Sequence, residues 1–110
     1  MKKLNQLREQ IGDNNAAQPC NEFAWLVANT EGDLDEALRY SQRSLELTGE
    51  NNGSYRDTLA RVYYAKGDID EALKQQTEAA ASLPHNRAIV KQIEVYRAKV
   101  AEKKQSPKRP

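Results

Sequence analysis

The sequence predicts an all-α fold in which antiparallel helix-turn-helix units stack on one another. Three observations support this: an internal repeat, apolar residues at helical spacing, and turn and capping residues between the apolar stretches. The segment GDLDEAL, which begins at Gly32, recurs as GDIDEAL from Gly67, a separation of 35 residues. A fixed period of this length is typical of repeat proteins, whose units bury their apolar faces against their neighbours.

The second copy shows the helical hairpin most clearly. Gly67 can adopt the left-handed conformation that ends a first helix, and Asp68 or Asp70 can cap a second one. Pro84 stops that second helix after Leu83 because proline cannot continue a helix. The residues at helical spacing on either side of the turn are Leu59, Ala60, Tyr63, Ala72, Leu73, Gln76, Ala79 and Ala80.

Apolar stripes at both ends predict two further helices. Leu4, Leu7 and Ile11 form a stripe closed by Gly12, which suits the second helix of a preceding half-repeat. A closing helix carries the stripe Ile89, Ile93, Tyr96 and Val100. We therefore predict one domain over 1–101, made of a leading helix (1–12), a first repeat (17–52), a second repeat (53–86) and a capping helix (87–101), followed by a disordered basic tail (102–110).

The second repeat resembles the tetratricopeptide repeat over its full length. The matching residues are Leu59, Ala60, Tyr63, Gly67, Asp68, Glu71, Ala72, Ala79 and Pro84. The first repeat departs further from the family pattern, with Ser44 in place of a late alanine and Gly49 in place of the usual proline. In both repeats the early tryptophan of the family is replaced, by Cys20 and Arg56. The resemblance implies a short right-handed solenoid with end helices.

The resemblance also implies a concave groove, lined by the first helix of each repeat, that holds a peptide or a helix of a partner protein. The residues that it places there are Asn21, Trp25, Ala28, Asp57, Arg61, Tyr64, Lys91 and Val95. Two interpretations of Trp25 remain open. It can be an exposed interface anchor, since tryptophan is frequent at binding hot spots, or it can pack under Leu7 and Ile11. Of these, packing is favoured.

One known ligand class does not fit the groove. Chaperone-binding members of the family hold a C-terminal carboxylate with lysine and asparagine at two groove positions. Those positions hold Asn21 and Trp25 in the first repeat, and Asp57 and Arg61 in the second. Because an aspartate would repel a carboxylate, we do not expect a carboxylate-clamp chaperone tail as the ligand.

No residue pattern points to catalysis, a cofactor or a metal. His85 is the only histidine and is expected in a loop, far along the chain from Cys20. Cys20 is the only cysteine, so no intrachain disulfide can form. It is expected to pack as a small apolar residue, the alternative being a reactive thiol near a helix start. The acidic turns lack the spacing of a calcium-binding loop, and helix capping explains them.

Composition excludes further classes of function. The net charge is only +1, so a nucleic-acid partner is not expected, although the tail could be a nuclear signal or a minor-groove contact. No stretch is long and apolar enough for a membrane span, and no secretory signal is evident, so we expect a cytoplasmic protein. We expect a scaffold for protein–protein interaction and not an enzyme. The alternatives are a self-association module, such as a homodimer, or an accessory fragment of a larger enzyme such as a transferase.

Overall fold

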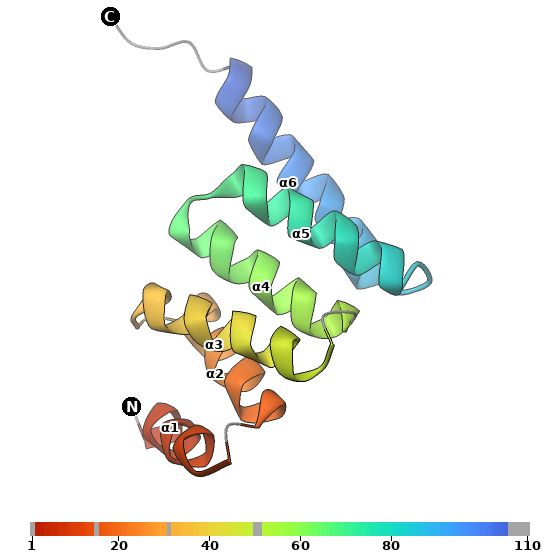
Figure 1. The fold of residues 1–110 in the computed structure, drawn as a ribbon. Coiled ribbons are helices and arrows are strands. Elements are labelled where there is room, and N and C mark those ends of the chain that lie inside the picture. Colours follow the sequence, from red (N-terminus) through yellow and green to blue (C-terminus); the bar gives the residue numbers. More distant parts are fainter. Residues whose placement is uncertain (1, 15, 31, 50–51, 106–110) are drawn as a thin grey trace, which may run out of the picture.

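The computed structural model describes residues 2–14, 16–30, 32–49 and 52–105 (Figure 1). Within these ranges the chain forms six α-helices and no strand, so the predicted all-α class is confirmed. The helices are α1 (Lys2–Asn14), α2 (Ala17–Asn29), α3 (Leu34–Leu47), α4 (Gly53–Lys66), α5 (Ile69–Ser82) and α6 (Arg87–Gln105).

The helices stack as antiparallel hairpins (Figure 1). α2 pairs with α3 and α4 pairs with α5, while α4 also packs on both helices of the preceding hairpin. α1 covers α2 at one end of the stack, and α6 packs on α5 at the other end. The result is an elongated body with extents of 49 × 36 × 19 Å, in which each hairpin contacts only its neighbours.

The turn of the second hairpin shows why the chain reverses there. Gly67 ends α4 with φ of 91°, a left-handed value that suits glycine, and its N–H donates to the Tyr64 carbonyl at 3.0 Å. Asp68, rather than Asp70, is the residue that caps α5, because its carboxylate accepts from the Glu71 N–H at 3.3 Å. Sequence signals thus locate both helix ends.

Small residues let the paired helices approach closely. Five alanines at the expected helix crossings are fully buried: Ala24, Ala37, Ala60, Ala72 and Ala79. Gly53 has a related role at the start of α4. A Cβ atom there would lie 2.9 Å from the Leu83 side chain and 3.0 Å from the Ala79 carbonyl oxygen, so the start of α4 lies directly against the end of α5.

The core consists of two clusters of unequal size. The larger one joins α1, α2 and α3 with one residue of α4, and its buried members are Leu4, Leu7, Ile11, Cys20, Phe23, Ala24, Val27, Ala37 and Val62. The smaller one joins α4, α5 and α6 around Ala60, Ala72 and Tyr96. Leu45, Leu59, Ala79 and Ile89 are buried as well and lie outside both clusters.

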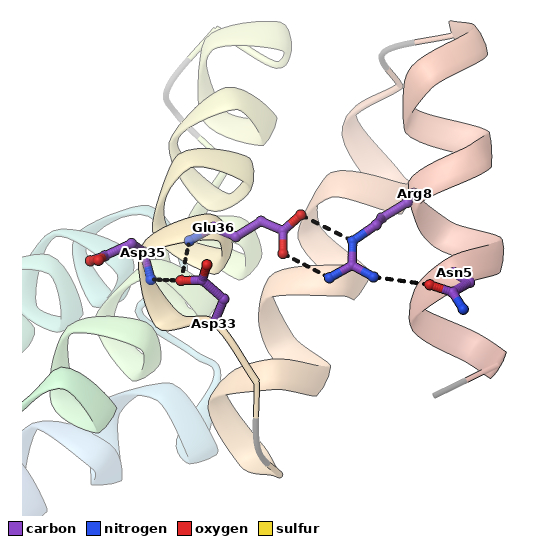
Figure 2. Close-up of polar contacts among 5 residues, drawn as sticks. All are labelled: Asn5, Arg8, Asp33, Asp35 and Glu36. Atoms are coloured by element: carbon purple, nitrogen blue, oxygen red, sulfur yellow. Dashed lines mark hydrogen bonds and ion pairs between the residues drawn. The ribbon is translucent and has the colours of Figure 1, made fainter.

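Arg8 fixes the leading helix α1 to the first hairpin (Figure 2). Its Nη2 and Nε donate to the two carboxylate oxygens of Glu36 at 2.8 and 3.0 Å, and its Nη1 donates to Asn5 at 3.0 Å. The guanidinium also lies over the ring of Phe23, with its carbon 5.1 Å from the ring centroid. Asp33 caps α3 at the same place and holds Glu36 in the first turn of that helix.

Replacing Arg8 with alanine should lower the melting temperature by roughly 2–5 °C, because the change removes a bidentate ion pair and a cation–π contact at once. Circular dichroism melts would measure the shift. Lys99→Ala is the matched control, since Lys99 pairs with Glu102 at 3.9 Å within a single exposed helix. Equal shifts for the two variants would contradict a special role for Arg8.

A second ion pair links the two hairpins. Lys66, at the end of α4, contacts Asp35 in the first turn of α3. The hydrogen bond and charge of Lys66 lower the pKa of Asp35. The contact joins helices that are next to each other in the stack, and it adds an exposed ion pair to the packing of α4 on α3.

Two predicted boundaries are wrong. α1 does not close at residue 12 but continues to Asn14, since an isolated glycine costs a helix only about 1 kcal/mol. The tail does not begin at residue 102, because α6 runs on to Gln105 and Lys99 pairs with Glu102 one turn later. Charged residues with good helix propensity extend α6 beyond its apolar stripe. Residues 106–110 of the predicted tail lie outside the described residues.

Candidate functional site

The residues expected in the groove lie on three helices that follow one another in the stack. They are Asn21 and Trp25 on α2, Asp57, Arg61 and Tyr64 on α4, and Lys91 and Val95 on α6. α4 packs against α2, and Tyr64 of α4 stacks on Tyr96 of α6. α4 therefore lies between α2 and α6, with an extensive contact to α2 and a ring contact to α6.

Trp25 is exposed. At 47% it has the highest exposed fraction of any large apolar side chain in the described part of the chain. The interpretation that it packs under Leu7 and Ile11 is wrong, because those residues join the cluster around Phe23. Trp25 follows Phe23 by two positions, roughly 200° around the helix, so its indole faces away from α1.

A hollow of mixed character lies where the end of α2, the turn into α3 and the end of α4 come together. Its volume is about 290 Å³, and Ala28, one turn after Trp25, forms part of its wall. The rest of the wall comes from Val27, Thr30, Gly32, Leu34 and Ala65. The exposed indole thus lies on the same helix as a hollow with both apolar and polar walls.

Asp57 is tied into the fold. Its carboxylate accepts a hydrogen bond from the Gln76 amide at 2.7 Å, and the same amide donates to the Ile89 carbonyl at 3.0 Å. Gln76 is fully buried. One side chain of α5 thus connects α4 to the start of α6, and Asp57 helps to position the helices as well as contributing charge.

Tyr64 is half-buried and not a free anchor. Its ring stacks on that of Tyr96 with centroids 5.0 Å apart and an interplanar angle of 28°. Tyr96 is fully buried, and burial raises the pKa of its phenol, an effect opposed by a hydrogen bond with Gln92 and by the nearby cation of Arg61. The expected residues Asp57, Arg61 and Tyr64 are therefore gathered around one buried tyrosine.

The α6 residues are accessible. Lys91 is exposed, and Val95 is 40% exposed. In the ranges that the structure describes, neither Lys91 nor Arg61 forms an ion pair. Two polar atoms of the expected set, Asn21 Oδ1 and Arg61 Nε, are buried without a hydrogen-bond partner among the described residues.

Sequence reasoning did not assign Gln76, Gln92 or Tyr96 to the site. Gln76 and Tyr96 occur in apolar stripes, which indicates burial but not contact with the groove. A polar residue inside a buried stripe is the one signal that could have found Gln76, since buried amides need partners. The hollow beside Ala28 has no counterpart in the sequence pattern, because it depends on how two helices diverge.

The described residues contain no group of three or more His, Cys, Asp or Glu side chains placed to hold a metal ion. His85 is exposed in the turn between α5 and α6. Cys20 is fully buried in the larger cluster, and burial raises the pKa of its thiol. This environment fits the expected packing role and opposes thiolate reactivity. None of the described helices is long and apolar enough to cross a membrane.

Comparison with known families places this arrangement. The family model described as tetratricopeptide repeat matches residues 25–84, which is 60 of the 110 residues. The matched range begins within α2 and ends just after α5, so it takes in most of both hairpins. No match to the chain was found among curated proteins or among solved structures.

Proposed function

The chain belongs to the tetratricopeptide-repeat family, and we propose that it is a scaffold that holds a peptide or helix of a partner protein in its concave groove. Repeats of this family generally mediate protein–protein interaction. The groove is the surface formed by α2, α4 and α6. In this role the chain binds and does not catalyse.

The exposure of Trp25 is the observation that carries the proposal. A large, rigid indole left in water costs free energy that burial against a partner would recover, and tryptophan is enriched at binding hot spots. Ala28, one turn further along α2, borders the hollow of about 290 Å³, which offers a ligand side chain both apolar and polar contacts.

The charges of the groove favour a ligand with an acidic side chain. Arg61 and Lys91 contribute two cations without ion pairs in the described part of the chain. The carboxylate of Asp57 is engaged by the Gln76 amide. Pairing of a ligand carboxylate with either cation would mainly raise the association rate and fix the orientation of the ligand.

The proposal is tested by removing exposed groove side chains while the packing stays intact. We expect Trp25→Ala with Val95→Ala to weaken partner binding by about tenfold or more, because two apolar contacts are lost. Tyr64 is left unchanged, since its stacking on Tyr96 supports the fold. The measurement is a quantitative pull-down from native lysate, followed by titration of the captured partner.

The matched control is Leu47→Ala with Val90→Ala. These residues are 42% and 40% exposed and lie outside the expected groove set. The control variant should bind as wild type does, and both variants should keep near-native melting temperatures. If the variant with Trp25→Ala and Val95→Ala retains the same partners, the proposal is contradicted. A shift from dimer to monomer in the control variant, seen by light scattering, would favour the self-association alternative instead.

A further inference from the structure

A second hollow, separate from the groove, opens between α3 and α5. Its volume is about 380 Å³. Its wall includes Gln42 and Leu45 from α3, Leu59 and Tyr63 from α4, and Gln75 from α5. Its wall also includes the charged residues Glu46 of α3 and Arg56 of α4, so the hollow lies where α3, α4 and α5 face one another, whereas α2, α4 and α6 form the groove. The proposed function makes no use of it.

The corresponding space at the preceding junction, where α1 packs on the first hairpin, is filled by side chains. α1 occupies the position before the first hairpin that α3 occupies before the second, and Leu4 and Ile11 align with Leu38 and Leu45 at a separation of 34 residues. At that separation Gln42 is the equivalent of Arg8. Arg8 lies over the ring of Phe23. Its guanidinium also pairs with Glu36 (Figure 2).

The residues around Arg8 also have smaller equivalents at the second junction. Leu59 is the equivalent of Phe23 at a separation of 36 residues, and Gln75 is the equivalent of Tyr40 at a separation of 35 residues. At the first junction the two aromatic rings meet edge to face, with centroids 4.9 Å apart, and close the space. An aliphatic side chain and an amide replace the two rings at the second junction, while Tyr63 stands where Val27 does and Arg56 where Cys20 does, and the hollow lies among these four side chains.

The second junction keeps a carboxylate that can accept hydrogen bonds from a guanidinium. Glu71 is the equivalent of Glu36 and occupies the same place in the first turn of its helix. It accepts from the Gln75 amide at 2.8 Å, and no cation pairs with it among the described residues. Arg56, which forms part of the wall of the hollow, is held by Glu78 at 3.0 Å and by Gln75 at 2.6 Å. Glu71 does not line the hollow itself and adjoins it through Gln75, with its own charge unpaired among the described residues.

We propose that this hollow receives an arginine side chain of a partner protein, whose guanidinium pairs with Glu71 as that of Arg8 pairs with Glu36. The arginine stem would lie over Leu59, where Arg8 lies over Phe23. Arginine fits better than lysine because its planar fork binds both oxygens of a carboxylate, as Arg8 does. The site would give the scaffold a second contact, to a basic segment, outside its groove.

The first test supplies the arginine from within the chain. Gln42→Arg should raise the melting temperature by roughly 1–5 °C, because its guanidinium can reach Glu71 across the hollow. The gain should disappear in the Glu71→Gln background, whereas Gln42→Met should give no gain that depends on Glu71. An equal gain from Gln42→Arg in both backgrounds, or no gain in either, would overturn the assignment.

The second test uses a ligand of known structure. N-acetyl-arginine amide, titrated to tens of millimolar, should shift the side-chain amide signals of Gln42 and Gln75 in nitrogen-15 NMR spectra. The citrulline analogue has nearly the same shape without the charge and should not shift them. Glu71→Gln and Gln42→Arg should each abolish the response, while Trp25→Ala should leave it intact. Equal shifts with the citrulline analogue, or none with the arginine ligand, would contradict this proposal without bearing on the proposed function of the groove.

One further outcome concerns the source of the arginine. The chain carries Arg109 near its C-terminus. If light scattering shows a dimer that Arg109→Gln and Glu71→Gln each dissociate, the hollow takes the tail of a second copy, and the assignment to another protein is overturned. A monomer at all concentrations agrees with a separate partner.

Discussion

Replacing Ala72 with leucine should lower the free energy of unfolding by about 1–3 kcal/mol or more. Ala72 is fully buried at the crossing of α4 and α5, beside Ala60 in the smaller core cluster. Three added carbon atoms have no space there, so the helices must separate or the side chain must adopt a strained rotamer. Urea unfolding followed by circular dichroism would measure the loss.

The control for this prediction is Ala101→Leu. Ala101 is exposed on α6, so leucine there adds the same atoms without a steric clash. Its stability should stay within about 0.5 kcal/mol of wild type. A stable Ala72→Leu variant would mean that α4 and α5 are less closely packed than the structure has them.

Replacing Tyr96 with alanine should cost about 3 kcal/mol or more, because it empties the largest fully buried site in the described part of the chain. The loss includes the stacking contact with Tyr64. We expect α6 to detach first, and hydrogen exchange to rise in α6 before it rises in α2. Urea unfolding and hydrogen-exchange mass spectrometry together would show both effects.

Tyr96→Phe separates packing from hydrogen bonding at this position. It keeps the ring on Tyr64 and removes only the hydroxyl that bonds with Gln92. The expected loss is about 1 kcal/mol. If alanine and phenylalanine cost the same amount, the ring contributes little, and α6 must be held by other contacts.

Much of the fold was predictable because local signals coincide with the repeat. Gly67 and Asp68 act directly on the chain next to them, so the turn between α4 and α5 can be read from the sequence. The fully buried alanines were predictable for a similar reason, since small residues at a fixed period mark close helix contacts. Helix ends without a capping residue were harder to predict, since Gly12 does not end α1 and charged residues extend α6.

The candidate site was less predictable, because helical spacing gives the face of a residue but not what covers that face. The sequence placed Tyr64 in the groove, and only the structure shows that Tyr96 of α6 lies on its ring. Trp25 was expected to be covered and is exposed, because the position of α1 decides whether its face of α2 is buried. Contacts between elements far apart in the sequence set both outcomes.

The unequal filling of the two junctions has a mechanical consequence. Aromatic rings and Arg8 fill the space between α1 and α3, and any tilt there would compress closely packed side chains. Between α3 and α5 the hollow of about 380 Å³ leaves that side of the second junction less filled, while α4 stays packed on both α2 and α3. We therefore expect movements of the stack that accommodate ligands of different width to take place on the α3–α5 side, with the α4 packing kept.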